Sequence, residues 1–138
     1  MTRRSLCGLA GGLMGAVPEV KIKDFRLWPV RATARTVWLA VELGSLQGIA
    51  GLGEASDAFG FAATAAQGRE MDVMLGRFVG LMVGRSPFEI SFYRKVGKPL
   101  ARSGGLVAAT AYSAGEQALS NLAGQALGVP TSTLFGGH

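Results

Sequence analysis

Residues 114–138 read AGEQALSNLAGQALGVPTSTLFGGH, and this stretch decides the fold. Small and apolar side chains recur in it at spacings of three and four, a pattern typical of one face of a helix. Gly128 and Pro130 then end the periodicity, and a short apolar segment follows. We therefore expect a long helix over about residues 106–127 whose small-residue face lies close to another element. That face consists of Ala111, Tyr112, Gly115, Ala118, Leu119, Leu122 and Ala126.

Three strand-like runs lie far upstream of this helix. The first, VKIKDFRLWPVRA at 20–32, begins with alternating apolar and polar residues, and Pro29 favours an edge position or a bend near its end. The second, TVWLAVEL at 36–43, is rich in β-branched and aromatic residues. The turn GSLQG leads into the third, IAGLGEA at 49–55, and predicts an antiparallel meander. Three strands cannot bury both faces alone, so helices must cover one side.

The segment between the strands and the last helix predicts two more helices. Residues 64–84 carry an apolar stripe at helical spacing, in which we interpret the methionines as core filler rather than a binding surface. The run Ser-Pro-Phe-Glu at 86–89 combines a capping hydroxyl, a first-turn proline and a carboxylate, which predicts a short helix through about Lys95. Glycines and proline in 96–105 are expected to break it. The stripe consists of Met71, Met74, Leu75, Phe78, Leu81 and Met82.

These elements predict an α+β fold, a three-stranded antiparallel β-meander followed by a bundle of three to four helices. A length of 138 residues suits one domain, and 49% hydrophobic residues with 17% charged residues indicate a globular chain. No apolar run is long enough to span a membrane, so we expect no membrane partner. The net charge is +5, but the basic residues are scattered, so we also expect no nucleic-acid partner. With one Cys and one His, an internal disulfide and a His-based metal cluster are excluded.

Residues 1–19 differ in character from the rest. Arg3 and Arg4 precede the largely apolar stretch 6–17, which resembles a twin-arginine export signal. The more ordinary interpretation is an N-terminal extension ahead of a domain at 20–138. We accordingly expect a cytoplasmic protein, with export as the alternative.

The order of strands and helices, the run GRSPFE and above all SAGEQALSNLAGQALGVPTSTLFGG resemble the N-terminal capping domain of the mandelate racemase and muconate lactonizing enzyme group in the enolase superfamily. The resemblance covers residues 20–137. One departure is Ser120-Asn121, where the family often has Trp-Asp, which bears on packing near the interface with the rest of the enzyme.

The resemblance implies that the chain leads into a (β/α)-barrel of roughly 200 or more residues, which this sequence lacks. In the family the barrel supplies the Mg²⁺ ligands and the Lys or His bases that remove the proton α to a carboxylate of a small substrate. We therefore expect no catalytic residue, no metal ligand and no cofactor in this chain. Its implied function is the capping and specificity domain of a racemase, cycloisomerase or acid-sugar dehydratase, inactive alone. The alternative is a free-standing, self-associating structural or interaction protein that reuses the fold.

A substrate-capping loop is implied at 53–65, GEASDAFGFAATA. Asp57 would accept a hydrogen bond from a substrate hydroxyl, and Phe59 and Phe61 would form an apolar wall. The alternative is that both phenylalanines pack on the sheet while Glu54 and Asp57 are solvated.

Without a barrel, the small-residue helix face and the segment 129–135 would face water, unless a barrel made as a separate chain covered them. Roughly 600 Å² of bare apolar surface would favour a homo-oligomer. The expected interface residues are Leu119, Leu122, Leu134 and Phe135.

Overall fold

The computed structural model describes residues 15–34, 36–55 and 65–137. Within them lie three strands followed by four helices, so the predicted α+β class is confirmed. The loop residues Asp57, Phe59 and Phe61, and most of the N-terminal extension, lie outside the described residues. The elements are β1 (Ile22–Arg31), β2 (Val37–Ser45), β3 (Ala50–Glu54), α1 (Ala65–Gly80), α2 (Ile90–Ser103), α3 (Gly105–Leu127) and α4 (Thr131–Leu134).

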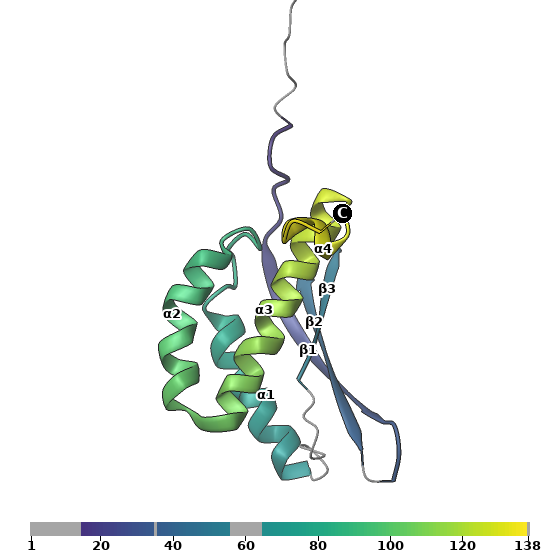
Figure 1. The fold of residues 1–138 in the computed structure, drawn as a ribbon, viewed down its shortest axis with the longest axis vertical. Coiled ribbons are helices and arrows are strands. Elements are labelled where there is room, and N and C mark those ends of the chain that lie inside the picture. The colour runs from purple at the N-terminus through teal and green to yellow at the C-terminus, as the bar shows by residue number, and fades with distance from the viewer. Residues whose placement is uncertain (1–14, 35, 56–64, 138) are drawn as a thin grey trace, which may run out of the picture.

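The strands form one antiparallel sheet in the order β1-β2-β3, as the turns predicted. Pro29 lies in the edge strand β1, opposite Leu39, so the missing N–H breaks no pairing in the centre of the sheet. Side chains of β2 alternate strictly, and Leu39, Val41 and Leu43 are buried on the face that the helices cover. The four described helices lie on this one side of the sheet, and none of them covers the other side (Figure 1).

Helix α3 packs directly on β3, because the contact consists of glycines. A Cβ on Gly51 would meet the Ala118 carbonyl oxygen and would lie 2.5 Å from the Leu122 amide nitrogen. A Cβ on Gly53 would likewise meet the carbonyl oxygen of Ala114. The small-residue face of α3 therefore does approach another element closely, and that element is this chain's own sheet.

This packing corrects the expected interface. Leu119 is 1% exposed and Leu122 is 0% exposed, so both belong to the core. The face that was expected to be bare is covered by β3, and in the folded chain neither side chain is available to a second copy. Leu134 and Phe135 are exposed, at 37% and 64%.

The helical layer has an aromatic centre. Tyr93 of α2 and Tyr112 of α3 stack with ring centroids 5.0 Å apart, and Phe78 of α1 meets both rings edge-on. Gly97 allows the stack, since a Cβ there would lie 2.8 Å from the Tyr112 ring. The interpretation of methionine as core filler is confirmed for Met71 and Met82, which are at most 1% exposed.

The second helix differs from the prediction. It begins at Ile90 and continues to Ser103, passing through Pro99, instead of ending near Lys95. The Ser86 and Glu89 side chains do accept hydrogen bonds from backbone N–H groups, Ser86 from that of Phe88 and Glu89 from that of Ser86, but these bonds close a turn before the helix. Packing of Gly97 and Ala101 in the core outweighs the local preference of glycine and proline to end a helix.

Candidate functional site

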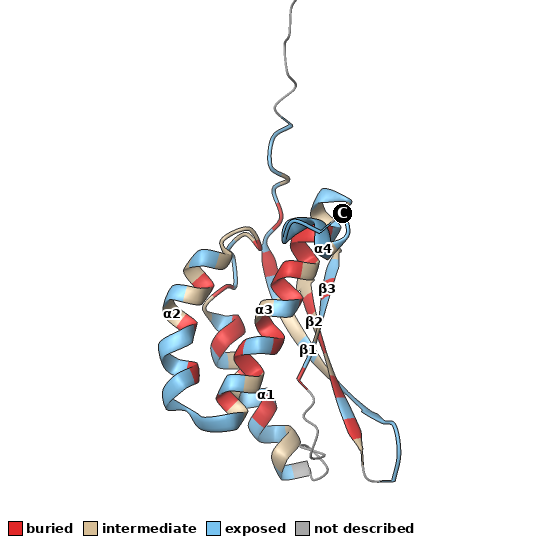
Figure 2. Ribbon diagram, in the orientation of Figure 1, coloured by how far each residue is buried: buried red, intermediate tan, exposed pale blue. Residues whose placement is uncertain are grey.

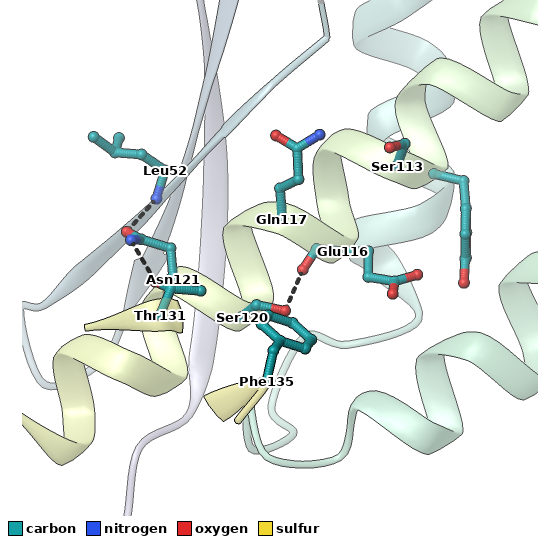
Figure 3. A pocket seen from close by; sticks show the side chains of 9 residues that line it. Leu52, Ser113, Glu116, Gln117, Ser120, Asn121, Thr131 and Phe135 are labelled. Atoms are coloured by element: carbon teal, nitrogen blue, oxygen red, sulfur yellow. Dashed lines mark hydrogen bonds between the residues drawn. The ribbon is translucent and has the colours of Figure 1, made fainter. Parts of the chain in front are cut away.

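A groove of about 410 Å³ lies where β3, α3 and α4 meet. Most of its lining residues are of polar type, with Leu52 from β3 and Phe135 from the end of α4 as the apolar ones (Figure 3). Helix α3 supplies six of the side chains, spaced so that they face one side of the helix. The groove is lined by Leu52, Tyr112, Ser113, Glu116, Gln117, Ser120, Asn121, Thr131 and Phe135.

One wall of the groove closes the edge of the sheet. Asn121 Oδ1 accepts the backbone N–H of Leu52 at 2.9 Å, and Gln117 Oε1 accepts that of Glu54 at 3.2 Å. These N–H groups point away from β2 on the edge strand β3, and two amide side chains one helical turn apart satisfy them. The Asn121 amide nitrogen in turn donates to Thr131 Oγ1 at 3.1 Å, which ties α4 to the same wall (Figure 3).

Ser120 lies at the floor of the groove. It is 5% exposed, and its hydroxyl donates back to the Glu116 carbonyl oxygen at 2.9 Å. Together with Phe135 it also lines a second cavity of about 290 Å³, on the α2 side. Open space therefore lies on both sides of the short Ser120 side chain. The remaining walls of the second cavity are Pro87, Phe88, Ile90, Arg94, Ala123 and Leu134.

The charged group of the groove is Glu116. Its Oε1 accepts two hydrogen bonds from the Arg94 guanidinium, at 2.6 and 2.8 Å. Burial alone would raise the pKa of this carboxyl, but the Tyr112 hydroxyl and Arg94 outweigh burial and hold the pKa below its ordinary value. The carboxylate therefore stays ionised and already has a cationic partner.

Tyr112 contributes a buried hydroxyl close enough to Glu116 to affect its pKa, but within the described residues the geometry of this hydroxyl meets the criteria for a hydrogen bond with no partner. Burial, followed by the nearby Glu116 carboxylate, raises the pKa of Tyr112. Its neighbour in the ring stack is satisfied, because the Tyr93 hydroxyl donates to the Tyr112 carbonyl oxygen at 2.9 Å. The groove thus offers hydroxyl and amide groups for binding, while the raised pKa of Tyr112 keeps its hydroxyl protonated and the lowered pKa of Glu116 makes it a weak base.

The side chains that the structure describes do not form a metal site. Among the residues that the structure describes, no three Cys, His, Asp or Glu side chains come together as ligands. Glu116, the one carboxylate of the groove, is bound to Arg94. The part of the chain described here also contains no helix long and apolar enough to cross a membrane.

The predicted site residues fall in three places. Asp57, Phe59 and Phe61 are not among the described residues. Leu134 and Phe135 line the second cavity and Phe135 also lines the groove, while Leu119 and Leu122 are core residues.

Sequence reasoning missed the polar wall formed by Glu116, Gln117 and Asn121. The signal was present as polar side chains at helical spacing opposite the small-residue face. Glu54, which was considered solvated or part of the loop, ends β3 and is exposed.

No family model and no curated protein matches the sequence. Solved enolase-superfamily structures do match the fold. A provisionally named dehydratase from Zymomonas mobilis ZM4 is 26% identical with a TM-score of 0.67, covering 86% of this chain and 30% of that one. A mandelate racemase/muconate lactonizing enzyme from a Sulfitobacter species is 23% identical, with a TM-score of 0.66 and the same coverage.

A third match is an enolase from Agrobacterium radiobacter, provisionally named as a galactarate dehydratase and solved with bound Na and L-malate. It is 22% identical with a TM-score of 0.67, over 85% of this chain and 28% of that one. The chain therefore spans less than a third of the length of these three structures. The predicted resemblance is confirmed at the level of the fold, over an extent consistent with a capping domain.

Proposed function

We propose that this chain acts as the capping domain of an enolase-superfamily enzyme that abstracts a proton α to a carboxylate. The observation that carries the proposal is the extent of the fold match: 86% of this chain aligns with only 30% of the mandelate racemase/muconate lactonizing enzyme. The names of the matched proteins, dehydratase and racemase among them, indicate the reaction class. The L-malate in one of them supports a small carboxylate as the substrate class.

In this role the groove at Ser120 is part of the contact surface between this chain and a barrel domain. Phe135 is 64% exposed, and both it and the buried Ser120 line two cavities. Protein interiors are close-packed, so this unfilled space is typical of a surface that another domain covers. Side chains from a barrel domain would fill this space and cover Phe135. The barrel would also contribute the Mg²⁺ site and the bases, because the described side chains of this chain fit neither.

The chain's own contribution is then enclosure of the substrate. The segment 56–64 between β3 and α1 includes Asp57, Phe59 and Phe61, which we propose contact the substrate. Closing a site with such a loop excludes water and selects the substrate, and requires no chemistry from the loop itself.

The test uses the purified chain in D₂O with Mg²⁺ and a set of acid sugars and mandelate-like acids. We expect no exchange of the α-proton for deuterium, measured by proton NMR, because the bases belong to the barrel. Exchange that survives repurification and disappears with EDTA would overturn the assignment of the chemistry to a second domain. The coding DNA beyond the His138 codon gives an independent result: a barrel sequence there, in frame or shifted, is expected, and an unrelated sequence would count against the proposal.

A further inference from the structure

We propose that the cavity of about 290 Å³ beside Ser120 accepts one aromatic side chain of the barrel domain. The inference rests on the proposed function, which supplies that domain. The cavity lies between the turn that precedes α2, the carboxy-terminal half of α3, and α4. Helix α4 has no buried residue, whereas this half of α3 includes several, so the cavity lies at the boundary between core and surface (Figure 2).

The lining of the cavity is apolar both at its floor and at its mouth. Pro87 and Ala123 are buried and mark the floor, while Leu134 and Phe135 are exposed and mark the mouth. Six of the eight lining residues are apolar, so the cavity takes an apolar group. A cavity of about 150 Å³ is enough to hold benzene. The larger space here therefore admits an indole or phenyl ring with its first methylene group.

Water is a poor occupant, because both polar side chains of the lining are already engaged. The Ser120 hydroxyl donates to the Glu116 carbonyl oxygen at 2.9 Å. Arg94 donates from Nε and Nη2 to one carboxylate oxygen of Glu116. A buried water needs about two to four polar partners, and this lining offers few. Filling the cavity with an apolar group is therefore favoured over hydrating it.

The other lining groups favour an aromatic ring over an aliphatic group. The two bonds to Glu116 hold the Arg94 guanidinium in place, and a cation fixed beside an apolar cavity attracts the face of a ring. Phe88 and Phe135 add two rings to the lining, and aromatic pairs are favourable beyond the area that they bury. Because the Glu116 carboxylate balances the guanidinium charge, the site selects an uncharged ring.

The neighbourhood of the cavity favours a protein side chain as the source of the ring. Ser120 and Phe135 line both this cavity and the groove of about 410 Å³. A backbone lying in the groove would meet the exposed side chains of Ser113 and Gln117 while its aromatic residue enters the cavity. A free aromatic compound would use the cavity alone.

The probes are indole and N-acetyl-tryptophanamide, titrated into the ¹⁵N-labelled chain and followed through its backbone amide signals by two-dimensional NMR. We expect both to shift the signals of Ala123 and Leu134, with a Kd on the order of 1 mM for ligands of this size. Benzyl alcohol should bind roughly two- to fivefold more tightly than cyclohexylmethanol, which has a similar size but no π face. The signal of Val73 on α1 should not move.

Variants that fill the cavity should block the probes. Ser120→Phe places a ring in the cavity and should weaken indole binding at least about tenfold, because a close-packed site has no room for a ligand. Ser103→Phe is the matched control: Ser103 is exposed at the other end of α2, so indole affinity should not change. Ala123→Leu fills the cavity from its floor and should also weaken binding. It guards against misfolding of Ser120→Phe, which far-UV circular dichroism would reveal.

The outcomes separate this inference from the proposed function. No shift at Ala123 or Leu134 with any probe would overturn the inference and leave the capping function standing. Equal effects of Ser120→Phe and Ser103→Phe, or equal affinities for benzyl alcohol and cyclohexylmethanol, would also overturn it. Binding of indole with exclusion of N-acetyl-tryptophanamide would overturn the protein side chain as the source, in favour of a free aromatic compound. An unrelated sequence beyond the His138 codon would instead count against the capping function, and with it against the barrel as the source.

Discussion

Asn121 on α3 accepts the backbone N–H of Leu52 on the edge strand β3 at 2.9 Å. One helical turn earlier, Gln117 does the same for Glu54. These two bonds run beside the glycine contacts that let α3 approach β3, so the helix both covers the inner face of the strand and closes its edge.

Two replacements of Asn121 distinguish the loss of the hydrogen-bond acceptor from a change in side-chain charge. Asn121→Ala leaves the Leu52 N–H without its partner and should lower the free energy of unfolding by about 1 kcal/mol. Asn121→Asp keeps an acceptor for Leu52, and the Thr131 hydroxyl can turn to donate to the new oxygen, so stability at pH 7 should stay within about 0.5 kcal/mol. Urea unfolding measures both changes. Equal losses in the two variants would show that the acceptor is not what matters.

Local patterns predicted the sheet well because its determinants are local. Alternation in β2 marks its buried face, and the five-residue and four-residue connections leave few ways to join three strands. The same reasoning predicted the end of α2 too early, because it judged Gly97 and Pro99 only by their low intrinsic helix propensity. What keeps the helix intact is distant in sequence: the Tyr112 ring fits against Gly97, a contact no local pattern records.

Pro99 should consequently destabilise the folded chain, so that replacing it increases stability. Pro99 lies inside α2, where it has no backbone N–H to donate to a helix hydrogen bond, and its side chain is exposed. Pro99→Ala should raise the free energy of unfolding by roughly 1–3 kcal/mol by restoring a hydrogen bond and relieving the helix. Thermal and urea unfolding test this, with Lys95→Ala as a control for a simple change of exposed side chain. A loss of stability on replacing Pro99 would mean that the proline is needed to position α2.

The candidate groove was harder to predict than the fold, because it depends on which face of α3 meets the sheet. The sequence pattern places Leu119 and Leu122 at an interface only if a barrel covers the small-residue face, whereas both side chains are buried within the chain. Once β3 occupies that face, the opposite polar side chains become the walls of the groove. Only the strand glycines Gly51 and Gly53 carried this information, and their meaning depends on a helix more than sixty residues away.

The Arg94–Glu116 pair should make stability depend on acidic pH. The folded-state pKa of Glu116 lies below its ordinary value of 4.5, so the ionised form is favoured by folding. The resulting stability is fully present above about pH 4.5 and is lost as pH falls through the lower folded-state pKa. With both side chains partly solvated, the loss should be on the order of 1 kcal/mol. Glu116→Gln should remove this part of the pH dependence, and Arg94→Gln should reduce it. An unchanged stability profile between pH 3 and 7 in both variants would contradict the assignment.

The glycine contact between β3 and α3 gives the sharpest test of the packing. A Cβ on Gly51 would collide with backbone atoms of Ala118 and Leu122, which cannot rotate away as a side chain could. Gly51→Ala should therefore cost about 3 kcal/mol or more, at the upper end of overpacking effects, because the helix must move off the strand. Gly68→Ala is the opposite case: its Cβ would meet nothing within 4 Å on α1, so the exchange should add roughly 0.5–1 kcal/mol. Equilibrium unfolding measures the effect of the same Gly→Ala replacement at a packed position and at an open one. If Gly51→Ala were as stable as Gly68→Ala, α3 would not lie on β3 as described, and Leu119 and Leu122 would again be candidates for an exposed interface.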